Sequence, residues 1–243
     1  MIIDADLSSL EYKVAAELSK DALMIAEIKE GLDIHSANAI NLFGDVSFRQ
    51  AAKVLTFRLL YGGSAYAFHM DANMPKLGLD KWEEIVENFY SKYSGLKKWQ
   101  RENYKFVTKH GYYSSFTGRH FKFYPKKGKD GTLEYSWPST CNYIVQSVAT
   151  ADIVPLVLIK LMKIYKDVSP DIKLINQVHD SIVIDAPSKY LEVIAENALS
   201  TFEAIPQLIK DHYEYDWETP MGGEVKYGDN WSEMTNYIRR ANG

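Results

Sequence analysis

Hydrophobic and polar positions along the chain predict strands near both of its ends and mostly helices between them. Residues 1–6 form an apolar run that ends in an acid, which predicts a short buried strand. The clearest strand pattern lies at 172–185, where two apolar runs flank His179-Asp180 and predict a hairpin. Residues 111–124 predict a second hairpin, with Thr117-Gly118 at its turn.

Apolar residues at helical spacing predict the helices. Ser8-Ser9-Leu10-Glu11 and Ser47-Phe48-Arg49-Gln50 both have the form of a capping box, in which a serine begins a helix and a Glu or Gln three residues later bonds back to it. The predicted helices are one that follows Ser8 and includes Leu18, one that begins near Ile34, and those over about 47–61, 79–92, 94–109, 138–166 and 187–205.

This order of elements predicts an α+β fold. The strands at the two ends of the chain are expected to share one sheet, with the helical block as an excursion from it. The sequence contains no internal repeat, low-complexity tract or obvious linker.

Composition narrows the class of protein. Hydrophobic residues make up 46% of the chain and charged residues 25%, which is typical of a soluble globular protein and excludes disorder. With Cys141 as the one cysteine, no internal disulfide or cysteine zinc cluster can form, and a reducing compartment fits best. No apolar run approaches the roughly 18 residues of a membrane span, and Met1 leads into no secretory signal. We therefore expect a cytoplasmic protein without a membrane partner.

Charge is placed unevenly. The net charge of −4 argues weakly against nucleic-acid binding, but ten Lys and Arg residues lie between Lys97 and Lys129, interleaved with aromatic side chains. Such a stretch, which includes Arg119, could follow a phosphate backbone. The alternative is a solvated helix face followed by a hairpin, because charge runs usually lie on the surface.

Two carboxylates stand where strands are predicted to end. Asp6 ends the first strand and Asp180 lies at the tip of the 172–185 hairpin. Carboxylates on neighbouring strands can hold a pair of Mg²⁺ ions, which stabilise the attacking and leaving oxygens of a phosphoryl displacement. The alternative for each is a turn residue, since Asp is common in turns.

The helix predicted over 47–61 carries Arg49, Lys53, Phe57 and Tyr61 at every fourth position. Each step of four residues rotates by only about 40°, so the four residues form one stripe. Cations at one end can bind a triphosphate and aromatic rings at the other can pack on a base or sugar. The alternative is an amphipathic helix whose aromatic residues enter the core and whose cations are exposed.

Other candidate residues are ambiguous. Glu11 is explained by its capping box, yet it also lies five residues after Asp6. His35 stands near a predicted helix start and His179 precedes Asp180, and both have ordinary structural explanations. The sequence has no Walker A, G-x-G-x-x-G, G-x-S-x-G or H-E-x-x-H motif, so nothing indicates covalent nucleophilic catalysis.

Taken together, these segments resemble the family A DNA polymerases, of the bacterial DNA polymerase I type. Asp6-Leu7-Ser8-Ser9-Leu10-Glu11-Tyr12-Lys13 resembles the first motif of that family, the 49–62 stripe the second, and Gln177-Val178-His179-Asp180 the third. Asp33-Ile34-His35 and Gly228-Asp229-Asn230-Trp231 resemble two further family segments. The similarity covers nearly the whole chain.

The resemblance implies an enzyme that adds dNTPs to a primer 3′-OH with two Mg²⁺ ions. It implies that Asp6 and Asp180 are catalytic and that Asp6, Leu7 and Asp180 bind the metal ions. It assigns the nucleotide to Arg49, Lys53, Phe57, Tyr61, His35 and Glu11, with Glu11 as the gate against ribonucleotides. It assigns contacts with primer–template DNA to Asn142, Gln146, His179 and Arg119.

The sequence also departs from the family pattern. Ser181 stands where a Glu usually follows the second Asp, so a third acidic group is expected to be missing. Ser9, Lys13 and Pro138 replace the usual Gln, Arg and Arg.

The largest departure is the position of the first motif, which lies within six residues of Met1. The resemblance implies fingers over 9–132 inserted into a partial palm of 1–8 and 133–243, with the thumb and exonuclease absent. The first strand is then expected to have an exposed apolar edge, covered by an N-terminal subunit that carries the thumb, the remaining palm and an exonuclease. We expect a split polymerase, such as a phage in a bacterial cell could encode.

Two other hypotheses remain open. The chain could be an inactive remnant that binds DNA or nucleotide, although intact Asp6, Asp180, Arg49 and Lys53 argue against decay. It could also be a relative that synthesises RNA, which Glu11 at the gate position disfavours.

Overall fold

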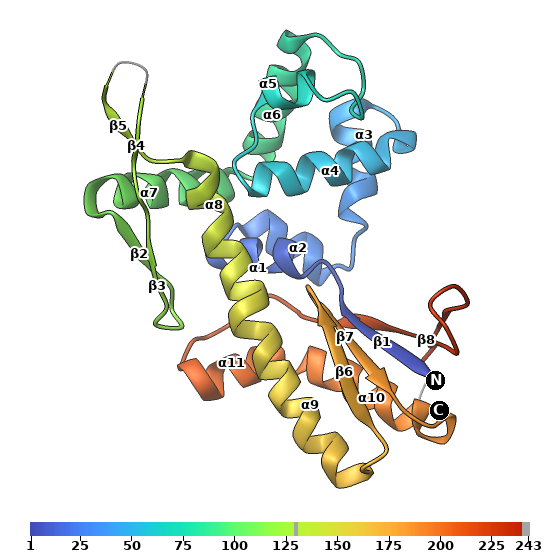
Figure 1. The fold of residues 1–243 in the computed structure, drawn as a ribbon. Helices are drawn as coiled ribbons and strands as arrows, with labels where there is room; N and C mark the ends of the chain where they lie inside the picture. The colour runs from blue at the N-terminus through green and yellow to red at the C-terminus, as the bar shows by residue number, and fades with distance from the viewer. Residues whose placement is uncertain (129–130, 240–243) are drawn as a thin grey trace. The chain divides into compact units, whose positions relative to one another are not determined.

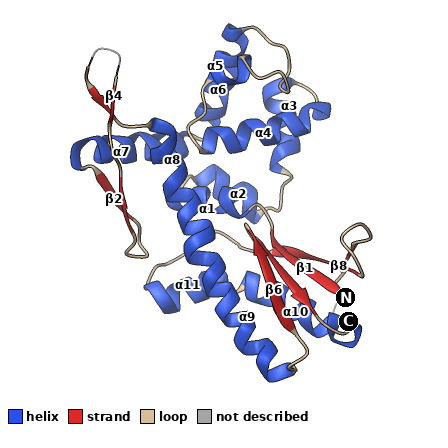
Figure 2. Ribbon diagram, in the orientation of Figure 1, coloured by secondary structure: helices blue, strands red, loops and turns tan. Residues whose placement is uncertain are grey.

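A computed structural model describes residues 1–128 and 131–239 of the chain, so that Lys129, the last cation of the basic stretch, lies outside the described residues. The chain forms two compact units. Unit 1 combines Met1–Leu10 with Ser147–Gly243, and unit 2 is Glu11–Gln146. Figure 1 shows the elements of both units in chain order, and Figure 2 shows that the longer strands belong to unit 1.

Unit 1 is built on a five-stranded antiparallel sheet in the order β6-β7-β1-β8-β9. Its strands are β1 (Ile2–Leu7), β6 (Lys173–Val178), β7 (Ser181–Asp185), β8 (Gly223–Gly228) and β9 (Thr235–Asn236). Alternation along β1 buries Ile3, Ala5 and Leu7 on one face of the sheet. Asp4 and Asp6 therefore share the opposite face.

Helices of unit 1 cover the buried face of this sheet. Their bounds are η2 (Ser147–Ile153, a π-helix), α9 (Val154–Val168), η3 (Ser188–Tyr190, a 3₁₀ turn), α10 (Leu191–Glu203) and α11 (Ile205–Tyr213). Helix α10 packs against β1 and β8, and α9 packs against α10 (Figure 1). The fully buried Phe202 of α10 lies against Gly223 of β8, where a Cβ atom would come within 2.4 Å of its ring.

The expectation that the first strand has an exposed edge is wrong. Strand β1 is internal, because it pairs with β7 on one side and with β8 on the other. The sequence did not reveal β8, since Gly223–Gly228 contains no apolar run. The edge strand next to β7 is β6, whose Ile175 and Val178 are exposed.

Unit 2 is mostly helical. Its elements are α1 (Leu10–Ser19), α2 (Ala22–Lys29), α3 (Ile34–Phe43), η1 (Val46–Phe48, a 3₁₀ turn), α4 (Arg49–Leu60), α5 (Ala65–His69), α6 (Leu79–Lys92), α7 (Ser94–His110) and α8 (Trp137–Gln146). Two small hairpins pair β2 (Tyr112–Ser114) with β3 (His120–Lys122) and β4 (Lys126–Lys127) with β5 (Leu133–Glu134). The sequence did not predict α2, α5 or the β4–β5 pair.

Aromatic rings and buried polar bonds hold unit 2 together. Trp82 is fully buried and stacks on Phe68 at 5.3 Å between ring centroids. At the C-terminal end of α4, the side-chain amide of Gln100 donates to the carbonyls of Leu59 and Leu60, both at 3.0 Å. These bonds satisfy carbonyls that a helix end leaves without partners, and they fix the position of the residue that follows, Tyr61.

Neither predicted capping box forms. The backbone N–H of Ser8 donates to the Gly222 carbonyl at 3.1 Å instead of to Glu11. At the second box, Asp45 is the N-cap, because its carboxylate accepts from the backbone N–H of Ser47 at 2.6 Å and begins the short η1 turn. Both sequences have the capping-box pattern, but the backbone N–H groups of Ser8 and Ser47 donate to Gly222 and Asp45 instead.

The helix predicted over 138–166 is one helical segment that runs through α8, η2 and α9. The division between the compact units falls within it at 146/147, whereas the sequence placed the boundary between fingers and palm after residue 132. This segment, Trp137–Val168, is also long and apolar enough to cross a membrane, contrary to the expectation from the sequence. Half of its most apolar window is buried inside the protein, so it is weak evidence for a membrane span.

Candidate functional site

The structure brings Asp6 and Asp180 together at one end of the unit 1 sheet. Asp6 of β1 lies opposite Ser181 of β7, the residue that follows Asp180. The backbone N–H of Leu7 donates to the Asp180 carbonyl at 3.2 Å, which ties the end of β1 to the hairpin turn. In that turn His179 takes a φ of 56°, a left-handed conformation that lets two residues connect β6 and β7.

Two further acids, which the sequence did not single out, lie on the same face. Asp4 accepts a hydrogen bond from the hydroxyl of Ser181. Glu224 of β8 lies directly opposite Asp6 and forms an ion pair with Lys226 at 2.7 Å. A third carboxylate is therefore present beside Ser181, supplied by the neighbouring strand. Only pairing with β7 and β8 reveals these residues, because their sequence positions carry no motif.

Burial and repulsion between these acids change the proton affinity of Asp6. Burial of the carboxyl group, followed by the charges of Asp180, Asp4 and Glu224, raises the pKa of Asp6 to about 6. Lys226 acts in the opposite direction. A group of carboxylates that repel each other is an environment in which a cation stabilises the ionised form.

The donor atoms of this end of the sheet fit Mg²⁺. Mg²⁺ is usually held by one or two carboxylates, with waters and substrate phosphates completing its shell. Asp6 and Asp180 can provide the carboxylates, and Leu7, whose side chain is fully buried, can provide only its backbone carbonyl. Within residues 1–128 and 131–239, no group of three or more Asp, Glu, His or Cys side chains is placed to hold a metal ion together.

The stripe on α4 faces away from the core of unit 2. Ala52, Leu55, Thr56 and Leu59 form the buried side of the helix. Arg49 and Lys53 are exposed, and Phe57 and Tyr61 are half-buried. The two rings are therefore neither fully buried in the core nor fully exposed, and they lie on the same side of the helix as the cations.

His35 lies beside this stripe. Its ring is 5.8 Å from that of Phe57, between centroids. Burial lowers the pKa of His35, and the positive charges of Lys53 and Arg49 lower it further. The side chain is more than nine-tenths buried, and its Nδ1 atom has no hydrogen-bond partner in the part of the chain that the structure describes. Asp33, the N-cap of α3, joins the group by bonding to Arg49.

Glu11 has a partner at the C-cap of α4. The hydroxyl of Tyr61 donates to the Glu11 carboxylate, which links the start of α1 to the end of the stripe. The sequence connects these two residues only through the family resemblance, because fifty positions separate them. Glu11 is thus held at the aromatic end of the stripe, in a place that the capping box does not explain.

The residues predicted to contact DNA are distributed over both units. Asn142 and Gln146 lie one turn apart on α8, Arg119 lies in the β2–β3 turn, and His179 lies at the exposed tip of the β6–β7 hairpin. The Oδ1 atom of Asn142 is buried and lacks a hydrogen-bond partner among the described residues. Part of the basic stretch is already paired, since Lys97 bonds to Glu87 at 2.9 Å.

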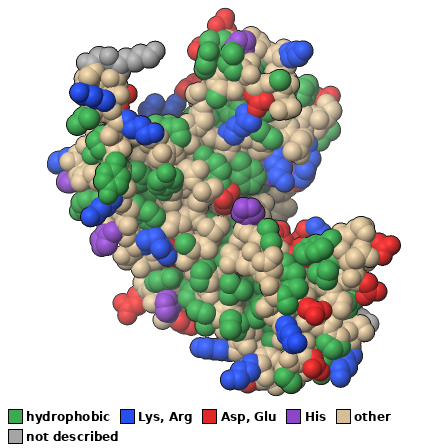
Figure 3. Space-filling model, viewed as in Figure 1, with side chains coloured by type: hydrophobic (Ala, Val, Ile, Leu, Met, Phe, Trp, Pro, Cys, Tyr) green, Lys and Arg blue, Asp and Glu red, His purple; other side chains and the backbone are tan. Residues whose placement is uncertain are grey.

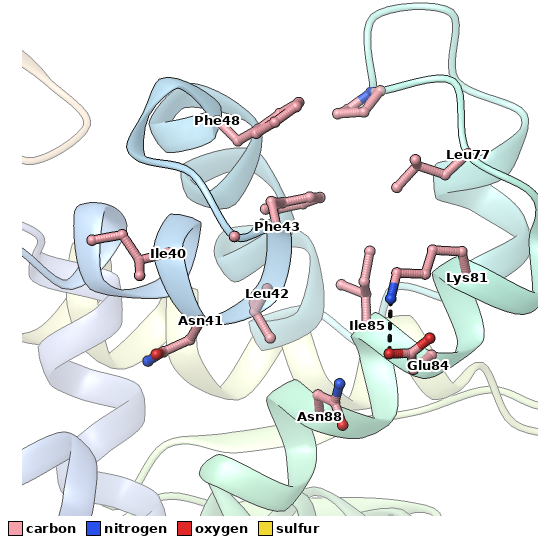
Figure 4. A pocket seen from close by; sticks show the side chains of 12 residues that line it. Ile40, Asn41, Leu42, Phe43, Phe48, Leu77, Lys81, Glu84, Ile85 and Asn88 are labelled. Atoms are coloured by element: carbon pink, nitrogen blue, oxygen red, sulfur yellow. Dashed lines mark hydrogen bonds and ion pairs between the residues drawn. The ribbon is translucent and has the colours of Figure 1, made fainter.

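A separate cavity of about 360 Å³ lies at the C-terminal end of α3 (Figure 4). Phe43 and Phe48 stack on one side of it and Leu77 and Ile85 lie on the other, with the Lys81–Glu84 ion pair at its rim. None of the residues predicted to bind nucleotide lines this cavity.

Known proteins resemble this chain in sequence and in fold. Residues 1–233 match the family model described as DNA polymerase family A. The chain belongs to this family. DNA polymerase I of Caldicellulosiruptor bescii is 29% identical over 240 residues, which cover 96% of this chain and 27% of that protein. The thermostable DNA polymerase I of Thermus aquaticus is 26% identical over 238 residues, with 95% and 27% covered.

A solved structure also resembles this family A chain. The polymerase domain of Pol1 from M. smegmatis, in complex with a DNA primer–template and dNTP, has a TM-score of 0.78 at 22% identity. The match covers 95% of this chain and 40% of that one, and it shows a shared fold. The chain spans about a quarter of the length of the curated relatives that it matches, 27% for two of them.

Proposed function

We propose that this chain is the part of a DNA polymerase that carries out template-directed synthesis, in which a primer 3′-OH attacks the α-phosphate of a dNTP and pyrophosphate leaves. In this proposal unit 1 belongs to the palm and unit 2 is the fingers. The observation that carries it is the pair of carboxylates Asp6 and Asp180 at the end of β1 and the β6–β7 hairpin, in a chain of family A.

Asp6 and Asp180 hold the metal ions in this proposal, with the Leu7 carbonyl as a further oxygen ligand. Two Mg²⁺ ions would activate the primer hydroxyl and neutralise charge on the transferred phosphate. The contribution of the chain is to fix the two carboxylates. Pairing of β1 on both sides and the Leu7–Asp180 bond support this role, because a metal site needs rigid ligands.

The α4 stripe binds the nucleotide. Arg49, Lys53 and His35 bind the triphosphate, and Lys and Arg side chains are visible over the α3–α4 region in Figure 3. Phe57 and Tyr61 pack against the base and sugar. Glu11, held by Tyr61, excludes the ribose 2′-OH.

DNA is contacted by Asn142, Gln146, His179 and Arg119. Their polar groups lie on exposed or half-buried positions, except for the buried Oδ1 of Asn142. That oxygen, which has no partner among the described residues, supports the proposal, because a buried acceptor without a partner is costly unless a ligand completes it.

The chain acts together with the further parts of a family A polymerase, on the same polypeptide or on a partner subunit, in the cytoplasm. Two observations support this. The curated relatives are much longer than the chain. Exposed apolar residues also lie over the edge strand β6 and over α9, where Ile159 is 52% and Met162 57% exposed (Figure 3).

Primer extension tests the proposal. In the assembled polymerase, Asp6→Ala and Asp180→Ala are expected to abolish extension and leave primer–template binding intact, because these residues act on charge in the transition state. Asp185→Ala, at the other end of β7, is the matched control and should retain extension. Near-normal extension by either of the first two variants would contradict the proposal. Full-rate synthesis by the 243 residues alone would contradict the need for further parts.

A further inference from the structure

Asp33 and Arg49 join the beginnings of two helices that lie side by side in unit 2, α3 and α4 (Figure 1). The guanidinium of Arg49 donates from Nε to Oδ2 of Asp33 at 2.9 Å and from Nη2 to Oδ1 at 3.2 Å. The pair is therefore bidentate, the arrangement that fixes both the distance and the plane of a guanidinium.

Asp33 is itself held in place. As the N-cap of α3 it accepts from the backbone N–H groups of His35 and Ser36, at 3.2 and 3.3 Å, and from the Ser36 hydroxyl at 2.7 Å. Its carboxylate orientation is thus set by the helix, and Arg49 is oriented through it. Without such an anchor, an exposed arginine samples many rotamers.

Within the described residues, the ion pair leaves one side of the Arg49 guanidinium available. A guanidinium has five N–H donors, and Asp33 occupies only the edge formed by Nε and Nη2. The edge formed by Nη1 and the second N–H of Nη2 can still bind an anion with two parallel bonds. The Arg49 side chain is 48% exposed, so an anion can reach it.

The surroundings of Arg49 also suit an anion. Lys53 lies one turn further along α4, and the buried ring of His35, two residues after Asp33, has its Nδ1 unpaired among the described residues. We propose that Asp33 is a positioning residue for nucleotide binding, which holds Arg49 so that its free edge is presented to the triphosphate. This inference rests on the proposed function.

The direction in which removal of the Asp33 charge changes nucleotide affinity separates the positioning role from its alternatives. If Asp33 were only a nearby negative charge, removing it would strengthen binding of an anionic triphosphate. If the carboxylate occupied the place of a phosphate and had to leave, removing it would also strengthen binding. If Asp33 positions Arg49, removing its charge weakens binding.

The test variant is Asp33→Asn, because Asn is as good an N-cap as Asp but cannot form the ion pair. Asp45→Asn is the matched control, since Asp45 is an exposed N-cap that pairs with no arginine in the described residues. Binding of mant-dATP to the full chain is measured by fluorescence, and KM and kcat are measured in the assembled polymerase. Asp33→Asn should weaken binding and raise KM about two- to fivefold, the scale of an exposed ion pair, with kcat unchanged.

A second set of variants keeps the result interpretable. Asp33→Ser, which also caps helices, should behave as Asp33→Asn if the fold is intact by circular dichroism. In an Arg49→Ala background, Asp33→Asn should no longer weaken binding. Arg49→Ala and Lys53→Ala themselves test the proposed function, since unchanged mant-dATP binding in both would contradict a nucleotide site on α4. Unchanged or tighter binding by Asp33→Asn, with Arg49→Ala impaired, would overturn the positioning role alone.

Discussion

The acids around Asp6 lead to an unusual expectation, that Asp6→Asn stabilises the metal-free protein while it abolishes synthesis. The carboxyl group of Asp6 is half-buried, and this burial, followed by the charges of Asp180, Asp4 and Glu224, raises its pKa to about 6. At pH 8 the group is ionised in spite of this environment. Asparagine has the same shape without the charge, so the substitution removes both the cost of burying a charge and the repulsion.

The magnitude follows from the pKa. The gap between the ordinary value of 3.8 and about 6 corresponds to about 3 kcal/mol in the free energy of unfolding if the group is fully shielded from solvent. Because Asp6 is half accessible to water, screening reduces the expected gain to about 1 kcal/mol. For a chain of this size that gain raises the melting temperature by about 2–4 °C.

The stabilisation that Asp6→Asn gives must increase as the pH rises. The raised pKa means that the folded protein binds the Asp6 proton more tightly than the unfolded chain does. Protonated Asp6 therefore stabilises the wild-type protein. This stabilisation is complete below a pH of about 3.8 and is lost as the pH rises through about 6. The advantage of Asp6→Asn should therefore be full at pH 8 and close to zero near pH 4.

Thermal unfolding of wild type and Asp6→Asn, in EDTA at pH 8 and near pH 4, measures the effect. Addition of Mg²⁺ at pH 8 should raise the melting temperature of wild type more than that of Asp6→Asn, because a cation relieves the same repulsion. Asp185→Asn, an exposed carboxylate at the other end of β7, should give no stabilisation. Destabilisation at pH 8, or an equal change at both pH values, would refute the reasoning.

Three further predictions concern single contacts. Gly223→Ala should destabilise the protein by about 1–3 kcal/mol in urea unfolding and impair extension, because its Cβ would lie 2.2 Å from the Asp6 carbonyl oxygen. Gly222→Ala, which has open space around its Cβ position, is the control and should unfold like wild type. Glu11→Ala should lower the free energy of unfolding by about 1 kcal/mol through loss of the Tyr61 bond, and it should raise incorporation of rNTPs relative to dNTPs. Lost stability with unaltered sugar preference would reject the role of Glu11 as a gate. Lys53→Ala should raise the pKa of His35, because the lysine charge disfavours the imidazolium; an NMR titration that finds no rise would show that the two side chains do not interact.

Much of the fold follows from periodicity in the sequence. The helices predicted over 79–92 and 94–109 are observed as Leu79–Lys92 and Ser94–His110, and the hairpin at 172–185 forms around its predicted turn. These elements have strong patterns because one face of each is buried. Strand β8 has no such pattern, since two glycines and a Glu–Lys pair interrupt it, and missing it led to the wrong conclusion that β1 has an exposed edge.

The candidate site was predictable where its residues lie close in the sequence. The spacing of Arg49, Lys53, Phe57 and Tyr61 predicts one helix face, and in the structure this is the less buried side of α4 and its C-cap. No pattern in the sequence predicted the contacts between side chains of different helices and strands. Asp33 reaches Arg49 sixteen residues away, and Asp4 reaches Ser181 across 177 residues. A phage origin, a split gene and the assigned DNA contacts stay predictions.

The position of β1 has a consequence for synthesis of the protein on the ribosome. The strand that carries Asp6 leaves the ribosome well before its two partners, β7 and β8, which lie at Ser181–Asp185 and Gly223–Gly228. At about 5–20 residues per second, the interval between Leu7 and Gly223 is on the order of 10–40 s. Unit 2 can complete its helices within that interval, since all of its residues precede Ser147. The apolar strand that bears Asp6 must stay soluble and unpaired during this time, so nascent chains paused between residues 146 and 181 should be where chaperones bind and where aggregation begins.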